Sequence, residues 1–467
     1  MNIAMIGTGY VGLVSGACLA DFGHHVWGVD TDRDRIERLR VADVPFHEPG
    51  LAEMVSQHMA SGRLRFTTDL ADAIRDSLVI FLAVGTPEGA GGQADMTQVT
   101  AAVEAVAAHV DGYRVIVTKS TVPVGTGALI RDMLVRLNRE IDCDVVSNPE
   151  FLREGSAVSD FLRPDRVVIG TTSDRAAAVM REIYRPLYLI ETPIVSTDIE
   201  TAEMIKYASN AFLAVKISFI NEIANLCDRA GADVHVVARA MGLDKRIGPK
   251  FLHPGPGFGG SCFPKDTRAL SALAAKHDVA VEVVDAAIRA NDRQRLLAVT
   301  KLEQALGGLA GRHVAILGLA FKPNTSDVRE APAIYVAREL VARGAQVCAY
   351  DPVAMPEAAR ALDQHADRVT FAADAYEAVE SADAVVIATE WNEFRSLDLA
   401  RRYRALRRPV ILDLRNVLEP ERAVAGGFTY YSTGRQAAAA GAGFSRPETT
   451  VGAGFSRPDA RQSWGPA

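Results

Sequence analysis

Short apolar runs alternate with stretches of helical periodicity through the first half of the chain. The first run, Asn2–Ile6, ends in a glycine turn, and the small residues of Val11–Phe22 predict a helix after it. His25–Asp30 alternates apolar and other positions and ends in an acid, which predicts a second strand. Later apolar runs separated by helical stretches are Leu78–Val84, Arg114–Thr118 and Val145–Ser147. Together they indicate βαβ units that form a parallel sheet.

The same order of apolar runs returns in the last third of the chain. His313–Leu317 leads into a glycine turn, and Ala345–Tyr350 is again followed by an acid, Asp351. Ala384–Ala388 and Pro409–Leu412 match the third and fourth runs of the first block. We therefore expect two doubly wound, Rossmann-like α/β domains. The second lacks a three-glycine turn and is the poorer dinucleotide site.

A long central helix and a low-complexity end complete the expected organisation. From Thr197 to about Ala230 apolar residues recur at helical spacing with no Pro or Gly. Such a helix forms either a subunit interface or the buried core of one chain. Near the C-terminus Gly441–Pro447 recurs as Gly452–Pro458, too short a repeat to build a fold. We expect an α/β domain at 1–197, a helical domain at 198–300, a second α/β domain at 301–435 and a disordered tail at 436–467.

Composition excludes several classes of protein. Of 467 residues 48% are hydrophobic and 23% charged, the balance of a globular protein, and the net charge is −7. This charge argues against nucleic acid and anionic membranes as partners. The five cysteines have no metal-ligand spacing, so we expect neither a metal site nor a disulfide framework. The N-terminal strand has no signal-peptide pattern, which favours the cytoplasm.

The turn Gly7-x-Gly9-x-x-Gly12 is the first candidate site. A strand precedes it, a helix follows it, and Asp30 ends the next strand, which is the order of a dinucleotide-binding unit. The helix N-terminus would bind pyrophosphate. Asp30 would bind the ribose hydroxyls and favour NAD over NADP, although the nearby Arg33 and Arg35 leave that preference open.

Four further polar residues follow predicted strands. Thr86 and Thr121 stand at the carboxyl edge where such sheets bind ligands, so each either contacts the cofactor or caps its strand. Glu150 and Glu154 follow the third later run. They are either general bases or solvated loop acids.

Two segments carry candidate catalytic groups. Lys206 and Asn210 are four residues apart on the predicted long helix, where an ammonium and an amide could stabilise an oxyanion. Alternatively, Lys206 extends its charge to solvent. Cys262 lies in a glycine-rich loop just before Lys265 and Asp266. It is either a buried thiol or a nucleophile whose pKa is lowered by nearby cations and N–H groups.

Six motifs in register resemble the UDP-glucose 6-dehydrogenases, within the nucleotide-sugar 6-dehydrogenase family. The resemblance covers about residues 1–435 and rests on Gly7–Gly12, Ser120–Thr126, Asn148–Gly155, Lys206–Ala211, Phe258–Asp266 and Phe321-Lys322 with Asp327–Glu330. It implies an enzyme with an N-terminal NAD domain, a helical centre that forms a homodimer, and a C-terminal domain for UDP. The implied reaction converts UDP-glucose, two NAD⁺ and water to UDP-glucuronate and two NADH.

The resemblance also implies a role for each motif residue. Cys262 would hold the half-oxidised sugar as a thiohemiacetal and then a thioester. Lys206 and Asn210 would stabilise oxyanions, and Asp266 and Thr121 would position water or relay protons. Glu154 would be the base for hydrolysis, assisted by Glu150.

Binding residues follow from the same resemblance. The implied cofactor contacts are Gly7, Gly9, Tyr10, Val11, Gly12, Asp30, Arg35, Thr86, Thr121, Glu154, Lys265 and Arg329. The implied substrate contacts are Glu150, Phe151, Leu152, Arg153, Glu154, Lys206, Asn210, Phe251, Leu252, His253, Pro254, Gly255, Gly259, Lys322 and Arg415. Three alternatives remain open: a GDP-mannose or other nucleotide-sugar 6-dehydrogenase, a two-electron dehydrogenase, and a scaffold protein without turnover.

Overall fold

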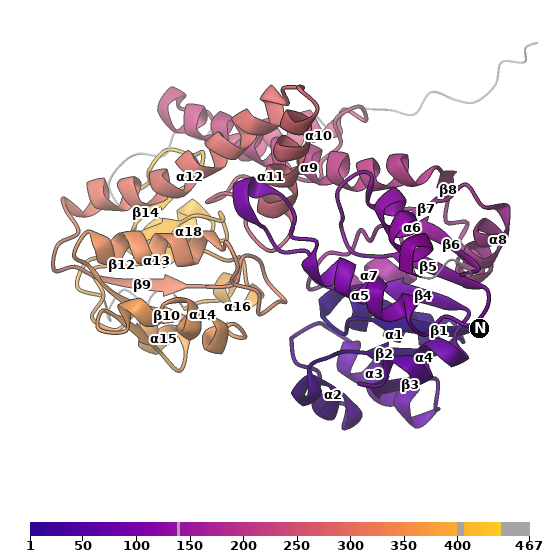
Figure 1. Cartoon of the computed structure of the whole chain (residues 1–467). Coiled ribbons are helices and arrows are strands. Elements are labelled where there is room, and N and C mark those ends of the chain that lie inside the picture. The colour runs from indigo at the N-terminus through magenta and orange to yellow at the C-terminus, as the bar shows by residue number, and fades with distance from the viewer. Residues whose placement is uncertain (138–140, 399–405, 440–467) are drawn as a thin grey trace, which may run out of the picture.

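Two α/β domains lie side by side, and a group of long helices crosses over both (Figure 1). The computed structural model describes residues 1–137, 141–398 and 406–439. This architecture confirms the expected fold class of two doubly wound domains joined by a long central helix.

The N-terminal domain is built on an eight-stranded sheet of order β3-β2-β1-β4-β5-β6-β7-β8. Its strands are β1 (Asn2–Ile6), β2 (His25–Val29), β3 (Leu64–Thr67), β4 (Val79–Leu82), β5 (Arg114–Thr118), β6 (Cys143–Ser147), β7 (Val167–Gly170) and β8 (Ile194–Thr197). Its helices are α1 (Tyr10–Asp21), α2 (Arg33–Arg40), α3 (Leu51–Ala60), α4 (Leu70–Asp76), η1 (Ala90–Gly92), α5 (Thr97–Ala107), α6 (Thr126–Leu137), α7 (Ala157–Leu162), α8 (Asp174–Ile183) and η2 (Arg185–Ile190). The predicted runs correspond to β1, β2, β4, β5 and β6.

Two strands depart from the expected parallel sheet, because β8 pairs parallel with β7 and shares its reversed direction. β7 runs antiparallel to β6, and only their last residues, Ser147 and Gly170, are paired. The connection from β6 to β7 contains only the six-residue helix α7. This helix is too short to carry the chain back to the amino ends of the strands, where a parallel strand would have to begin. β7 therefore approaches the carboxyl end of β6 from beyond it. The residues before β7 become a wall above that edge.

The C-terminal domain repeats the strand order of the first. Its six parallel strands are arranged β11-β10-β9-β12-β13-β14, which matches β3-β2-β1-β4-β5-β6. The strands are β9 (His313–Leu317), β10 (Gln346–Tyr350), β11 (Val369–Phe371), β12 (Ala384–Ile387), β13 (Val410–Asp413) and β14 (Thr429–Ser432). The helices are α13 (Pro332–Ala342), α14 (Met355–Ala361), η3 (Asp363–His365), α15 (Ala375–Ala378), α16 (Asn392–Arg395) and α18 (Pro420–Ala425).

Four helices join the two domains: α9 (Ile199–Ala230), α10 (Val234–Leu243), α11 (Phe263–Lys276) and α12 (Glu282–Leu306). The predicted helix at 197–230 is α9. The Asp198 side chain accepts a bond from Thr201 N at its start, and Gly231 ends it at φ 75°. Because α12 is continuous to Leu306, the domain junction that we propose lies after this helix rather than at residue 300.

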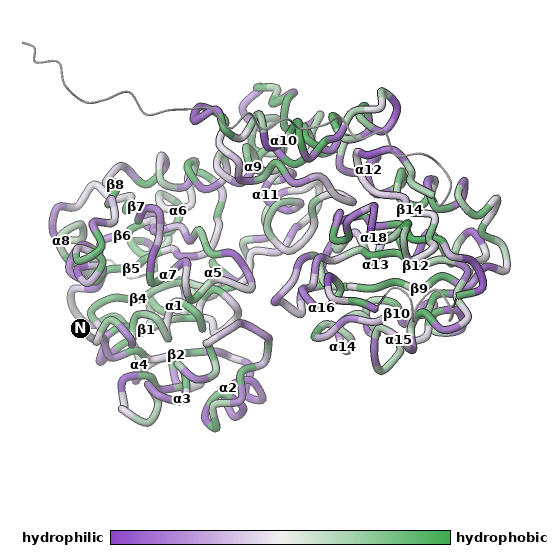
Figure 2. Tube along the Cα trace, turned by 180° about the vertical axis from the view of Figure 1, so that it is seen from behind, coloured by the Kyte–Doolittle hydropathy of each residue, from purple (hydrophilic) through white to green (hydrophobic). Residues whose placement is uncertain are grey.

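The core of each α/β domain is its sheet. β4 and β12, in the middle of the two sheets, are buried at every position, and the strands are the most hydrophobic part of each domain (Figure 2). Burial on both faces explains why these strands are continuous apolar runs.

The start of the expected tail belongs to the fold. Tyr430 and Ala438 exchange two backbone hydrogen bonds, and Ala438 is buried. Packed structure thus extends past residue 435, where we expected disorder to begin. The rest of the expected tail, 440–467, lies outside the described residues.

The described residues lack two features, a membrane-spanning helix and a cluster of metal ligands. None of their helices has both the length and the apolar character needed to cross a bilayer. Among the same residues, no three His, Cys, Asp or Glu side chains are grouped as a metal site requires.

Candidate active site

A cavity of about 480 Å³ opens beyond the carboxyl end of β6, between the loop after that strand, α9 and the start of α11. Eight of the predicted site residues line it: Glu150, Phe151, Leu152, Arg153, Lys206, Asn210, Phe251 and Cys262. These residues come from four separate segments of the chain. The fold therefore gathers most of the expected chemistry around one space.

Cys262 stands at the N-terminal end of α11, directly after the glycine loop. Burial raises the pKa of its thiol to about 11, and the charge of Glu150 adds to this while Lys206 opposes it. The sequence left open whether the thiol is buried or whether nearby cations and N–H groups lower its pKa. Burial outweighs them because it removes the water that would solvate a thiolate.

Lys206 and Glu150 form a buried ion pair beside Cys262. The Lys206 Nζ lies 2.9 Å from the Glu150 Oε1, and both side chains are at most 5% exposed. Burial alone would lower the pKa of Lys206, but Glu150, then Cys262 and Asp266, raise it overall. Lys206 is thus a cation held next to the sulfur.

Asp266 organises a second polar group. Its carboxylate is fully buried and accepts from Asn210 Nδ2 at 2.6 Å and from Lys265 Nζ at 2.7 Å. Lys206 and Asn210 lie one turn apart on α9, so a single helix carries both groups toward the cavity. Lys265, predicted to approach the cofactor, has its ammonium on Asp266 in this structure.

Glu154 connects the N-terminal domain to the Cys262 loop. It accepts from Ser261 Oγ at 3.0 Å, and the same hydroxyl lies 3.5 Å from the Cys262 Sγ. Burial raises the pKa of Glu154 to about 7, with a further rise from Asp327. The nearby cations Arg329 and Lys322 oppose the rise. A carboxyl of this kind can take a proton near neutral pH.

The C-terminal domain completes the surroundings of the loop. A Cβ on Gly259 would lie 2.3 Å from the Glu330 carbonyl oxygen, and Gly260 has φ +81°. The loop therefore requires glycine at both positions. Burial lowers the pKa of Lys322, while Glu154 and Cys262 oppose this. Arg415 donates to the Phe321 carbonyl oxygen and so holds the backbone beside Lys322.

Thr121 is positioned from two sides. Its carbonyl oxygen accepts from Thr86 Oγ1 at 2.8 Å. Glu203, one turn before Lys206 on α9, accepts from Gly125 N and Gly127 N at 2.7 and 2.9 Å. The loop that carries Thr121 is thus fixed to the helix that carries Lys206 and Asn210.

Several expected substrate contacts lie away from the cavity wall. Leu252 belongs to the core of the helical domain, and His253 is exposed. Gly255 is held by Asn221 and Gln294 through its N–H and carbonyl. Pro254 is buried beside it. Their role as ligands remains a prediction.

The glycine turn after β1 has the geometry of a phosphate-binding loop. Gly7 has φ +95°, and a Cβ on Gly12 would lie 1.9 Å from the Gly7 carbonyl oxygen. Among the described residues, nothing lies within 4 Å of a Cβ position at Gly9, and no side chain caps the start of α1. Asp30 accepts from Thr8, Asp32 and Arg35, which lowers the pKa of its carboxyl even though burial works the other way.

Three sequence profiles match in series along this framework. They describe the NAD binding domain (1–188), central domain (200–293) and UDP binding domain (315–420) of one family. The chain belongs to the UDP-glucose/GDP-mannose dehydrogenase family.

Relatives in this family match nearly the whole chain. A UDP-glucose 6-dehydrogenase of Rhizobium meliloti (strain 1021) is 52% identical over 439 residues, 93% of this chain and 100% of the relative. UDP-glucose 6-dehydrogenase TuaD of Bacillus subtilis (strain 168) is 49% identical, covering 93% and 94%. The solved UDP-glucose dehydrogenase of the archaeon Pyrobaculum islandicum is 40% identical with a TM-score of 0.86, covering 93% and 97%. This chain is thus an NAD-dependent dehydrogenase.

The two α/β domains of this dehydrogenase differ at the dinucleotide turn. Gly318, like Gly7, has positive φ and donates to the end of the neighbouring strand. Asp351 accepts from Leu319 N at 2.7 Å, as Asp30 accepts from Thr8 N at 2.8 Å, but it also accepts from Ala320 N at 3.0 Å. In the second turn the acid therefore occupies the N–H group at the position of Gly9, which a pyrophosphate would need. The residues around Gly9 therefore fit NAD, and the second turn does not.

Sequence reasoning missed a buried polar cluster in the wall of the dehydrogenase cavity. Lys119 Nζ donates to Asn148 Oδ1 at 3.0 Å and lies 3.3 Å from the Tyr184 hydroxyl. Burial lowers the pKa of Lys119 to about 8. The Arg166 guanidinium packs 3.6 Å from the Phe151 ring centroid. A lysine directly after β5, whose centre is the apolar run 115–117, was a usable signal for Lys119.

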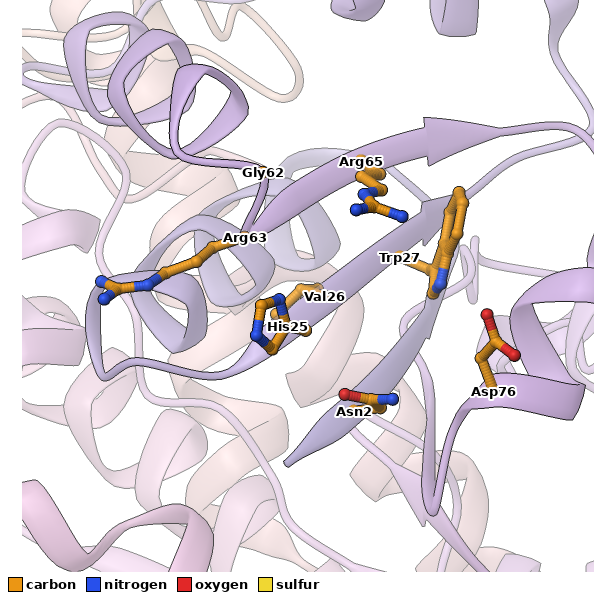
Figure 3. A pocket seen from close by; sticks show the side chains of 8 residues that line it. All are labelled: Asn2, His25, Val26, Trp27, Gly62, Arg63, Arg65 and Asp76. Atoms are coloured by element: carbon orange, nitrogen blue, oxygen red, sulfur yellow. The ribbon is translucent and has the colours of Figure 1, made fainter.

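A smaller cavity of about 260 Å³ lies at the opposite, amino edge of the first sheet. It is formed around the start of β1, β2 and β3 by residues such as His25, Trp27 and Arg65 (Figure 3). Arg65 packs against the Trp27 ring. None of the predicted site residues lines it, so it has no part in the dehydrogenase site.

Proposed function

We propose that this enzyme oxidises UDP-glucose to UDP-glucuronate, with two NAD⁺ and one water consumed per sugar. The observation that carries the proposal is that Cys262, Lys206 and Asn210 line one cavity. Relatives named UDP-glucose 6-dehydrogenase at 52% and 49% identity support the choice of sugar nucleotide. NAD bound at the Gly7–Gly12 turn supplies the hydride acceptor.

Cys262 prevents escape of the half-oxidised sugar. Its sulfur adds to the C6 aldehyde and holds the carbon as a thiohemiacetal, from which loss of a second hydride leaves a thioester. Because the resting group is a thiol, its proton passes to the aldehyde oxygen as the C–S bond forms, and this hydroxyl proton is lost together with the second hydride. Lys206 stabilises the negative charge that develops on sulfur and oxygen, and Asn210 adds an amide donor near the same atoms.

Hydrolysis of the thioester requires a base near Cys262. Glu154 reaches the Cys262 loop through Ser261 and has a pKa of about 7, which suits proton transfer at neutral pH. Glu150 assists by keeping Lys206 charged and oriented. Asp266 orients Asn210.

Cations around the cavity support a nucleotide-sugar ligand. Besides Lys206, the cavity is lined by Arg153, Arg163, Arg166, Lys216 and Lys250, against the two acids Asp160 and Asp165 outside the catalytic group. A diphosphate carries negative charge that such a wall would attract. The C-terminal domain would bind the nucleotide, with Lys322 and Arg415 next to the Cys262 loop.

A substrate panel tests this function. Purified enzyme with NAD⁺ is given UDP-glucose, GDP-mannose or UDP-N-acetylmannosamine, and NADH per sugar consumed is measured. We expect two NADH per sugar and turnover with UDP-glucose. Turnover confined to GDP-mannose would replace the substrate, whereas a firm value of one NADH would exclude the thioester route. NADP⁺ in place of NAD⁺ tests the preference assigned to Asp30.

We also infer a homodimer through α9 and a reducing compartment. Large apolar side chains recur along one face of α9 at Met204, Phe212, Phe219 and Leu226, each at least 40% exposed. A second copy would cover this stripe. All five cysteines are free, which agrees with the cytoplasm.

A further inference from the structure

Glu48 is a buried carboxylate outside the catalytic group described above. It is 6% exposed and lies in the segment between α2 and α3. Within the described residues no Lys, Arg or His forms an ion pair with it. Its charge must therefore be satisfied by hydrogen bonds.

Three donors from two segments converge on this carboxylate. Glu48 Oε2 accepts from Gly155 N at 2.6 Å and from the Tyr10 hydroxyl, and Glu48 Oε1 accepts from Ala157 N at 2.8 Å. Tyr10 is the first residue of α1, next to Gly9 of the NAD turn. Gly155 directly follows Glu154. One side chain thus joins the cofactor turn to the backbone of the proposed hydrolytic base.

The contacts continue from there to the nucleophile. Glu154 accepts from Ser261, whose hydroxyl lies beside the Cys262 Sγ. Gly155 has φ +77°, and a Cβ there would lie 2.8 Å from the Asn324 carbonyl oxygen. The backbone at Gly155 is therefore confined between Glu48 on one side and the C-terminal domain on the other.

We propose that Glu48 is a positioning residue for thioester hydrolysis, which it supports by fixing the Glu154–Gly155 backbone to the NAD turn. The proposal rests on the function proposed above. In the step concerned, water adds to the thioester carbon as Glu154 takes one of its protons. The C–S bond then breaks, the carboxylate product leaves, and the Cys262 sulfur departs as a thiolate that is reprotonated. Both oxidations precede this step and do not need Glu154 as base.

Glu48→Gln tests the proposal because glutamine has one acceptor oxygen where three N–H and O–H groups point. The amide NH₂ of the glutamine is a donor and would face a backbone N–H, which is also a donor. The backbone at Glu154–Gly155 must therefore shift. We expect hydrolysis to slow by about tenfold or more, while the two oxidations continue. Rapid mixing with UDP-glucose and NAD⁺ would then give a burst approaching two NADH per Cys262. Mass spectrometry of the quenched protein would find a covalent adduct on Cys262.

Two further variants complete the experiment. Tyr10→Phe removes only the phenol donor, and we expect a smaller burst with the same adduct on Cys262. If Glu48→Gln does not fold, Tyr10→Phe takes its place in the experiment. Glu53→Gln changes an exposed glutamate on α3 and should behave as wild type. Normal turnover in folded Glu48→Gln, or slow turnover without burst and adduct, would overturn the role of Glu48. Wild-type enzyme that makes no NADH from UDP-glucose would instead remove the proposed function itself.

Discussion

At Cys262, the burial that would protect a covalent intermediate from water also raises the thiol pKa to about 11. Before substrate binds, the sulfur is therefore a protonated thiol and not a thiolate. Lys206 lowers that pKa, whereas Glu150 and Asp266 raise it. Reactivity at this residue depends on the balance of three charged neighbours and not on the cysteine alone.

Cys262→Ser should leave an enzyme that binds UDP-glucose with almost no turnover. A hydroxyl is a much weaker nucleophile than a thiol, so we expect kcat to fall by about a thousandfold or more. Steady-state NADH formation and calorimetric binding of UDP-glucose measure the two effects. Cys348→Ser, on β10 of the other domain, is the matched control. Full activity of Cys262→Ser would remove this residue from the mechanism.

The raised pKa of Glu154 predicts that the rate of the hydrolysis step depends on pH. Its pKa is raised to about 7, chiefly by burial, so below pH 7 the carboxyl is protonated and cannot take a proton from water. We expect hydrolysis to become slower as the pH falls from 8 to 6, and the NADH burst to grow. Stopped-flow traces across this range provide the measurement. In Glu154→Gln the burst should be large at every pH, and a wild-type burst that shrinks toward pH 6 would contradict the assignment.

Among the elements, the loop at 254–262 depends most on its neighbours. α9 and α12 hold it through Asn221, Asn291 and Gln294, and Gly260 N donates to the Arg329 carbonyl oxygen. The loop has little regular structure of its own. Its conformation is set by two helices and the C-terminal domain together.

Gly259→Ala should therefore disturb catalysis strongly. The new methyl group would overlap the Glu330 carbonyl oxygen, and moving the loop away would also move Cys262. We expect a loss of kcat of about a hundredfold, measured as NADH formation from UDP-glucose. Gly112→Ala is the control, because within the described part of the chain its Cβ would meet only the end of the Arg114 side chain, at 3.5 Å. Equal activity of the two variants would show that the loop tolerates displacement.

The elements also show what the sequence could predict. Strands such as β1, β5 and β9 were predicted to the residue, since a strand buried on both faces is a bounded apolar run. The antiparallel β7 was not, because direction depends on how the chain returns and not on local pattern. Motif residues such as Lys206 and Cys262 could be found from sequence. Glu48 could not, because its importance depends on partners distant in the chain.

At the scale of the whole molecule, an apolar stripe on α9 is exposed in the part of the chain that the structure describes. Met204, Phe212, Phe219 and Leu226 are spaced by eight, seven and seven residues, which keeps them on one helical face. A stripe of this length exposed to water would be costly. The same helix carries Lys206 and Asn210, so a partner on α9 would also support the site.

Phe219→Asp combined with Leu226→Asp should convert a dimer to a monomer. Two carboxylates would have to be desolvated at the centre of the interface, which is unfavourable. Light scattering after gel filtration measures the mass. Tyr188→Asp, which alters an even more exposed large side chain away from α9, should leave the dimer intact. A monomeric wild type, or a double variant that remains dimeric, would contradict an interface on this stripe.

The twin sheets have one more consequence, for protein engineering. Introducing glycines after β9 would not by itself create a second NAD site, because Asp351 also accepts from Trp391 Nε1 at 3.0 Å and from Val353 N and Ala354 N. Five donors from three segments keep that acid inside its own turn. An engineered NAD site would first require these hydrogen bonds to be removed, including the one from Trp391, and the side chains around them to be repacked. The second domain thus shares the topology of the first, but residues in several segments would have to change together before its turn could bind NAD.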